Sequence, residues 1–278
     1  MEKPSHFKTT TRNEKRAYRQ TYYQLIDLDE MQRSNLLISG CNNSGKTNLA
    51  CQIVSILQRF KWRILVFDSS GAWRKQSDIP IYAIANFDYR TESFKIPLFN
   101  ESVVYDMTLL LPSEQKLFVD IILLGVWHKQ LETQNREWVL VVLEESQLYC
   151  KNVRSQIAEN LLRIMSVGRN QQVRVMAITP DLALIDASFI RLCGQRFHGK
   201  LSIEENGLRK YRLYYGSDWL RVTKLHDVGT FTYLLRNKLK VVCVPYFKTP
   251  SKPLDYRNQL KPANKLKAWF RKYIYRKQ

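Results

Sequence analysis

Eight consecutive residues have the composition of a loop that binds phosphate groups. They match the pattern G-x-x-x-x-G-K-[ST] and are Gly40, Cys41, Asn42, Asn43, Ser44, Gly45, Lys46 and Thr47. Glycine lets such a loop curl until its backbone N–H groups face the phosphates, while the lysine reaches the β and γ oxygens and the threonine hydroxyl binds Mg²⁺. A nucleoside triphosphate with Mg²⁺ is therefore the expected ligand. A chance glycine turn is the alternative, but an apolar run precedes the loop and a helical pattern follows it.

Two acidic residues, Glu144 and Glu145, directly follow the apolar run 138–143. Transfer of a phosphoryl group to water needs an acid that holds the metal and a group that polarises the attacking water, both near the γ-phosphate. Because the carboxyl ends of parallel strands meet at one edge of a sheet, we expect both carboxylates beside the phosphate loop. We assign Glu144 to the Mg²⁺ site and Glu145 to the general base. The alternative is that the two acids only end the strand and keep the loop that follows it in contact with solvent.

The elements that position these residues follow an alternating pattern. Short apolar runs alternate with helical patterns between residues 35 and 247, which is typical of repeated βαβ units. The runs predict strands at 35–39, 63–67, 138–143, 173–178, 195–199, 230–235 and 239–244. Helices are predicted at 46–60, 113–130 and 153–167. The expected fold class is α/β, with a mostly parallel central sheet flanked by helices.

The positive charge of the chain lies mainly in its two ends. The 278 residues carry a net charge of +19, of which residues 1–20 contribute +4 and residues 248–278 contribute +9. We divide the chain into a basic N-terminal arm (1–32), a P-loop ATPase domain (33–247) and a basic C-terminal linker and amphipathic tail (248–278). Basic extensions of this kind indicate a polyanionic partner, with nucleic acid favoured over anionic lipid.

The C-terminal tail has the pattern of an amphipathic basic helix. Leu266, Trp269, Phe270 and Tyr273 fall on one face, and lysines and arginines occupy the positions between them. Such a helix could pack on the ATPase domain, follow a nucleic-acid backbone, or lie on a capsid or anionic membrane surface. The sequence leaves these three possibilities open.

Several other classes of protein are disfavoured. The longest apolar runs have six or seven residues, against about 20 for a membrane span, and the charged N-terminus lacks the pattern of a secretory signal. The five cysteines and four histidines lack the spacing of a disulfide framework or a metal module. We expect a cytoplasmic protein, or one in the host cytoplasm or the virion if it is viral. Residues 237–240, Asn-Lys-Leu-Lys, have a lysine where a GTPase would have its guanine-reading acid, so ATP is preferred.

Five segments taken in order resemble the FtsK–HerA superfamily of DNA-pumping ATPases. They are GCNNSGKT, ILVFDSSGAW, WVLVVLEESQ, SVGRNQQVRVMAIT and LCGQRF, and they cover about residues 35–200. The likeness is greatest to the genome-packaging ATPases of archaeal viruses with internal membranes. This resemblance implies a RecA-like P-loop NTPase fold, with the Walker A motif at 40–47 and the Walker B motif ending in the glutamate pair. It also implies a homo-oligomer, a hexameric ring around double-stranded DNA.

The resemblance further implies a role for one arginine and shows three departures from the family, the first of which is Glu144-Glu145 where the family commonly has Asp-Glu. Arg169 matches the arginine finger that reaches the γ-phosphate bound by a neighbouring subunit; Arg163 is a rival, and an exposed cation at a helix end is the plain alternative. Ala72 stands where the family usually has an acid. Thr179-Pro180 stands where the family usually has a sensor glutamine, and proline has no N–H to donate.

The function expected from these residues and this resemblance is ATP hydrolysis coupled to translocation of double-stranded DNA, with packaging of a viral genome as the task. One alternative is a cellular or plasmid HerA-like ATPase of DNA transfer or end processing. A second alternative is a non-translocating P-loop nucleotide-binding protein or a small-molecule kinase.

Overall fold

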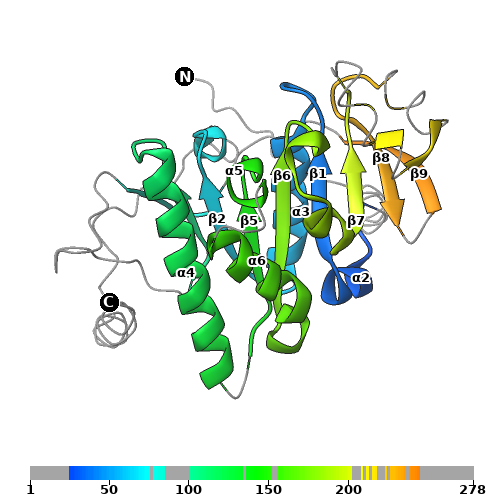
Figure 1. The fold of residues 1–278 in the computed structure, drawn as a ribbon. Coiled ribbons are helices and arrows are strands. Elements are labelled where there is room, and N and C mark those ends of the chain that lie inside the picture. The colour runs from blue at the N-terminus through cyan, green and yellow to red at the C-terminus, as the bar shows by residue number, and fades with distance from the viewer. Residues whose placement is uncertain are drawn as a thin grey trace, which may run out of the picture.

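The central element is a nine-stranded sheet (Figure 1). In this computed structural model the described residues are 25–75, 78–84, 101–133, 136–151, 156–201, 208, 211–212, 215–217, 223, 226–235 and 238–244. The strands are β1 (Asn35–Ser39), β2 (Arg63–Asp68), β3 (Ile81–Ala83), β4 (Val103–Asp106), β5 (Val139–Leu143), β6 (Val173–Thr179), β7 (Cys193–His198), β8 (Thr230–Leu235) and β9 (Lys238–Cys243).

The strands lie in the order β3-β4-β2-β5-β6-β1-β7-β8-β9. From β3 to β7 every neighbouring pair is parallel, whereas β8 and β9 are antiparallel additions at one side. One strand, β6, separates β1 from β5, so the ends of these two strands lie close together at the same edge. The mostly parallel α/β sheet expected from the sequence is thus confirmed.

Helices cover both faces of the sheet, with α4 and α6 on one side in Figure 1. The helices are α2 (Leu28–Arg33), α3 (Lys46–Arg59), α4 (Pro112–Glu132), α5 (Gln147–Cys150), α6 (Gln156–Val167) and α7 (Ala187–Arg191), with 3-10 turns η1 (Ala72–Lys75), η2 (Gly168–Gln171) and η3 (Leu182–Leu184). Within the described ranges, none of these helices combines the length and the apolarity that crossing a membrane requires.

Two hydrophobic clusters explain why the central strands read as continuous apolar runs. In β5 the side chains of Val139, Val141 and Leu143 pack with α4 and α6. Leu140 and Val142 pack on the opposite face with α3. Because both faces of the strand are covered, every one of its positions is apolar and buried.

The predicted elements differ from the observed ones in two respects. Most predicted bounds agree to within about two residues, and β1 and β8 agree at both ends. The sequence did not predict β3, β4, α2 or α7. The helix expected at 153–167 begins at Gln156, after the separate short helix α5, and residues 152–155 lie outside the described residues.

The last part of the expected N-terminal arm packs against the sheet. Leu25, Ile26 and Met31 are buried in the cluster on the α3 side. Asp27 accepts a hydrogen bond from the backbone N–H of Glu30 at 3.0 Å and so caps the N-terminus of α2. Residues 25–32 therefore form part of the folded domain. The division of the chain otherwise stays a prediction, because residues 1–24 and the tail lie outside the described residues.

Candidate nucleotide site

The phosphate loop connects β1 to α3 and depends on two glycines. Gly45 has a φ of 94°, a left-handed conformation that suits glycine, and it directly precedes α3. A Cβ atom added to Gly40 would lie 2.7 Å from Oγ of Ser44 and 3.2 Å from Cα of Gly199. The loop is thus a tight cradle at the N-terminus of a 14-residue helix. The N–H groups there lack partners within the helix and favour an anion.

Two distant segments hold this loop in shape. The N–H of Cys41 donates to the carbonyl of Lys200 at 2.8 Å, and the N–H of Gly229 donates to the carbonyl of Ser44 at 3.0 Å. Lys200 follows β7 and Gly229 precedes β8. The motif itself gives no sign of these contacts, because they join residues that are far apart in the chain.

Lys46 lies in the first turn of α3 and points back into the loop. Its Nζ donates to the carbonyl of Cys41 at 3.0 Å. Burial lowers the pKa of Lys46, whereas the nearby carboxylates of Glu144 and Glu145 act in the opposite direction. The structure therefore brings the loop lysine and the glutamate pair together, as the sequence predicts.

Thr47 and Glu144 meet at the edge of the sheet. The hydroxyl of Thr47 lies 3.3 Å from Oε1 of Glu144, whose side chain is buried. Burial raises the pKa of Glu144 to about 7, and the hydrogen bond from Trp73 opposes this rise. A hydroxyl and a carboxylate oxygen at the foot of a phosphate cradle are the hard oxygen ligands that Mg²⁺ prefers. These residues therefore fit the expected metal and nucleotide.

The sequence did not predict a site role for Trp73. Its indole Nε1–H donates to Oε2 of Glu144 at 2.8 Å. Its own backbone N–H donates to Asp68, the last residue of β2. Trp73 ends the segment ILVFDSSGAW, but no rule of spacing connects it with a glutamate 71 positions later.

Glu145 has an unusual backbone conformation next to the site. Its φ is 52°, in the left-handed region that residues other than glycine rarely adopt. The half-buried side chain accepts a hydrogen bond from Nε2 of Gln147. Such strain is often found where a functional side chain must be aimed in one direction.

Arg169 lies away from the phosphate loop of its own chain. It belongs to η2, which precedes β6, and it is exposed. The loop lies beyond the other end of β6, where Thr179 pairs with Ser39. Arg163, the rival finger, is exposed on α6 with its guanidinium 5.3 Å from the ring centre of Trp127.

Thr179, which replaces the usual sensor glutamine, is engaged in a local turn. Its buried hydroxyl donates to the carbonyl of Asp181 at 2.9 Å and accepts from the N–H of the same residue at 3.3 Å. These bonds orient the side chain toward the turn after β6. The turn and the phosphate loop nevertheless follow neighbouring strands.

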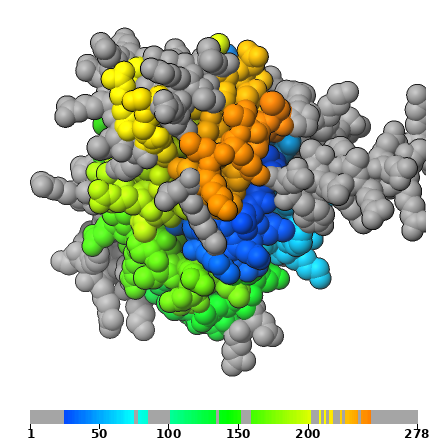
Figure 2. Space-filling model, turned by 90° about the vertical axis from the view of Figure 1, so that its right-hand side faces the viewer, coloured from blue at the N-terminus to red at the C-terminus, as the bar shows by residue number. Residues whose placement is uncertain are grey.

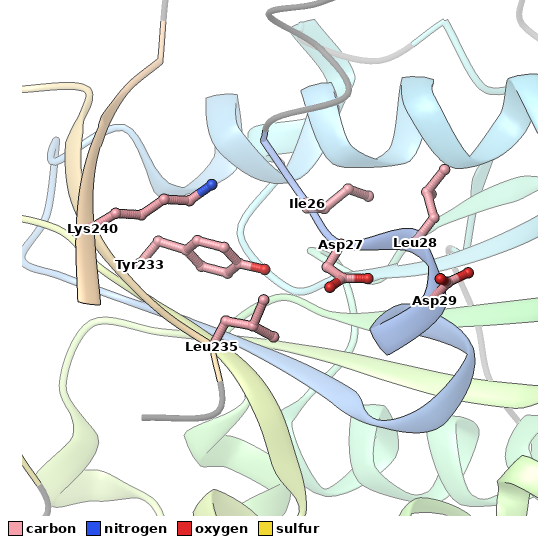
Figure 3. Close-up of a pocket in the computed structure, with 7 residues that line it drawn as sticks. All are labelled: Ile26, Asp27, Leu28, Asp29, Tyr233, Leu235 and Lys240. Atoms are coloured by element: carbon pink, nitrogen blue, oxygen red, sulfur yellow. The ribbon is translucent and has the colours of Figure 1, made fainter. Parts of the chain in front are cut away.

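A separate cavity of about 390 Å³ opens between α2 and the hairpin of β8 and β9 (Figure 3). Figure 2 shows these two segments side by side, in blue and orange. The lining residues are Ile26, Asp27, Leu28, Asp29, Tyr233, Leu235 and Lys240. The cavity shares none of its lining residues with the phosphate loop.

In the described part of the chain, no group of three or more histidine, cysteine or acidic side chains could hold a metal ion by itself.

Several solved structures have the same fold. The DNA-packaging ATPase B204 from Sulfolobus turreted icosahedral virus matches with a TM-score of 0.55 and 14% identity, over 75% of this chain and 96% of that one. The genome-packaging NTPase B204 of Sulfolobus turreted icosahedral virus 2, in complex with ATP-γS, matches with a TM-score of 0.54 and 14% identity, over 77% of this chain and 97% of that one.

A third match is the conjugation coupling protein TcpA of pCW3 with ATP-γS, with a TM-score of 0.52 and 14% identity, over 80% of this chain and 62% of that one. No family model and no curated protein sequence matches the chain. The RecA-like α/β fold implied by the resemblance is confirmed, as is the likeness of that fold to a packaging ATPase.

Proposed function

We propose that this protein is an ATPase of the FtsK–HerA type that moves double-stranded DNA and packages a viral genome. The contact of 3.3 Å between Thr47 and Glu144 carries this proposal, because it joins the phosphate loop to a carboxylate that can serve as a metal ligand at one edge of the sheet. The similarity in fold to a DNA-packaging ATPase over three quarters of the chain supports it.

The binding step follows from the geometry of the loop. The backbone N–H groups of residues 41–47 would face the phosphates, and Lys46 would exchange the carbonyl of Cys41 for phosphate oxygens. Thr47 and Glu144 would hold Mg²⁺, which when bound neutralises negative charge on the β and γ oxygens. ATP and Mg²⁺ are thus the proposed ligands.

The hydrolytic step would use Glu145. This carboxylate follows the metal-binding glutamate directly and is held by Gln147. As a general base it would orient the attacking water and take a proton from it as the bond to the γ-phosphorus forms, while the bond from that phosphorus to the β–γ bridging oxygen breaks and ADP leaves. Arg169 would complete the site of a neighbouring subunit, so that hydrolysis requires assembly into a ring, proposed to be hexameric.

Double-stranded DNA is the proposed partner because the net charge of +19 suits a phosphate backbone. A motor must hold every base pair alike, so its contacts should be with the backbone and independent of sequence. The basic tail would bind DNA or dock on a capsid or anionic membrane surface. A HerA-like ATPase of DNA transfer is the second candidate, favoured by the similarity in fold to a conjugation coupling protein.

The test is steady-state ATP hydrolysis as a function of duplex DNA and of protein concentration. We expect activity per molecule to rise with both, because subunits complete one another's sites and assemble on DNA. Lys46→Ala should abolish the activity, and Lys116→Ala, an exposed lysine on α4, should leave it unchanged. Activity that depends on neither DNA nor protein concentration would favour a kinase or a simple nucleotide-binding protein.

A further inference from the structure

The two carboxylate oxygens of Glu144 face different parts of the fold. Oε1 lies 3.3 Å from the hydroxyl of Thr47, whereas Oε2 accepts the hydrogen bond of 2.8 Å from the indole of Trp73. Trp73 is 0% exposed and Glu144 is 3% exposed. The indole nitrogen has one hydrogen to donate and accepts none. It therefore occupies one carboxylate oxygen and leaves the other directed at Thr47.

Trp73 is itself fixed by the turn that follows β2. Its backbone N–H donates to Oδ2 of Asp68 at 2.9 Å. The other carboxylate oxygen of Asp68 accepts from the N–H groups of Ser70 at 3.1 Å and Gly71 at 2.8 Å. Because β2 pairs directly with β5, this turn and Glu144 lie at neighbouring strand ends. A continuous hydrogen-bonded connection thus runs from Asp68 through Trp73 to the metal-site carboxylate.

We propose that Trp73 is a positioning residue whose indole N–H orients the carboxylate of Glu144 so that Oε1 and Thr47 together can bind Mg²⁺. The inference rests on the proposed function, because it takes the site to bind Mg²⁺ with a nucleoside triphosphate. Removing a hydrogen-bond partner of a metal ligand typically weakens metal binding about 10-fold to 100-fold. The hydrogen bond from Trp73 suits a glutamate, because ordering this long side chain costs more conformational entropy than ordering a short one.

A control variant separates this role from simple packing. Trp73 also fills the hydrophobic cluster on the α3 side, and so does Trp62, which is 5% exposed and stacks on Trp138 with ring centres 4.9 Å apart. Trp62 precedes the other end of β2, away from Glu144. Trp73→Phe and Trp62→Phe therefore remove the same atoms from the same cluster, but only Trp73→Phe removes the hydrogen bond to the carboxylate.

The experiment measures binding of a fluorescent methylanthraniloyl-ATP to the full chain, first in EDTA and then during titration with MgCl₂. For Trp73→Phe we expect affinity in EDTA close to that of the wild type. The Mg²⁺ concentration for half-maximal effect should rise about 10-fold or more. Trp62→Phe should change neither quantity. The proposal is overturned if the two variants behave alike, or if Trp73→Phe weakens binding equally with and without Mg²⁺. A wild type that does not bind the nucleotide would overturn the proposed function itself.

A second measurement applies if Trp73→Phe does not fold. The chain has six tryptophans, so nitrogen-15 labelling gives up to six indole N–H resonances. In the wild type we expect one of these to move when MgCl₂ and a non-hydrolysable ATP analogue are added. The same resonance should be displaced in Glu144→Gln, which lacks the charged acceptor. Indole resonances that are the same in the wild type and in Glu144→Gln would refute the proposal.

Discussion

Arg169 and Thr179 lie at opposite ends of β6, because Arg169 precedes this buried strand and Thr179 is its last residue. At about 3.3 Å per residue, the strand separates its two ends by roughly 20 Å. Thr179 pairs with Ser39, the residue before the phosphate loop. Arg169 therefore cannot reach the γ-phosphate bound by its own chain, and a catalytic role for it requires a second subunit.

Mixing two inactive variants tests this role of Arg169. Arg169→Ala should lower ATP hydrolysis about 1000-fold or more, as loss of an arginine finger does. Lys46→Ala should be inactive because it lacks the phosphate-binding lysine. We expect a mixture of the two to regain activity, since one supplies an intact loop and the other an intact arginine.

The matched control is Arg191→Ala, an exposed arginine at the end of α7, just before β7. By itself, Arg191→Ala should have wild-type activity. Activity of the mixture should not depend on Arg191. If the mixed variants stay as inactive as each alone while still assembling, Arg169 does not act across the interface. Measured phosphate release against the mixing ratio distinguishes the two outcomes.

Replacement of Glu145 should separate nucleotide binding from hydrolysis. Glu145→Gln keeps the size of the side chain and its contact with Gln147 but removes the base, so kcat should fall about 100-fold to 10,000-fold. ATP affinity should stay near the wild-type value, because the phosphate loop is untouched. Rapid-quench and nucleotide-binding assays measure the two quantities.

For this second prediction the control is Glu159→Gln, which alters an exposed glutamate on α6. It should change neither kcat nor affinity. If Glu145→Gln hydrolyses ATP at the wild-type rate, Glu145 is not the general base. Glu144 would then be the only glutamate of the pair with a role in the reaction.

His198 should make a destabilising contribution to the free energy of unfolding in mild acid. This buried imidazole lies 2.7 Å from the hydroxyl of Ser39, and burial lowers its pKa well below the usual value of 6.5. Below about pH 6.5 the unfolded chain therefore binds a proton that the native state refuses. This group alone should lower the free energy of unfolding by about 1 kcal/mol between roughly pH 7.5 and pH 5.5.

Urea unfolding of the wild type and of His198→Asn over that pH range measures the effect. Because the variant has no imidazole to protonate, the free energy of unfolding of the wild type should fall relative to that of the variant as the pH falls, by about the amount given. Parallel pH dependences for the two proteins would show that His198 does not contribute. The difference between the two curves removes the effect of Glu144, whose raised pKa acts in the opposite direction.

The sequence predicted where the phosphate loop and the glutamate pair lie, because its signals for both are local. The phosphate loop has a fixed pattern, an apolar run precedes it, and a helical pattern follows it. Glu144 and Glu145 follow an apolar run of six residues, a length that favours a buried strand over a helix. Parallel strand order then brings all of these residues to one edge.

The parts that the sequence did not predict are set by contacts between distant segments. β4 has four residues, Val103–Asp106, which are too few to show a period, and its apolar side chains are buried in the two hydrophobic clusters on the faces of the sheet. The hydrogen bond between Trp73 and Glu144 joins residues 71 positions apart, so no sequence pattern indicates it. By contrast, Asp27 followed three positions later by Glu30 is a recognised start of a helix, so α2 could have been predicted.

The central claim, that ATP hydrolysis moves this protein along double-stranded DNA, is tested most directly by displacement of a third strand. A fluorescent oligonucleotide is bound as a triplex near one end of a linear duplex, and its release is followed after ATP is added. We predict release by the wild type that requires ATP hydrolysis and is lost in Glu145→Gln. A wild type that hydrolyses ATP on the same DNA without releasing the third strand would contradict the account.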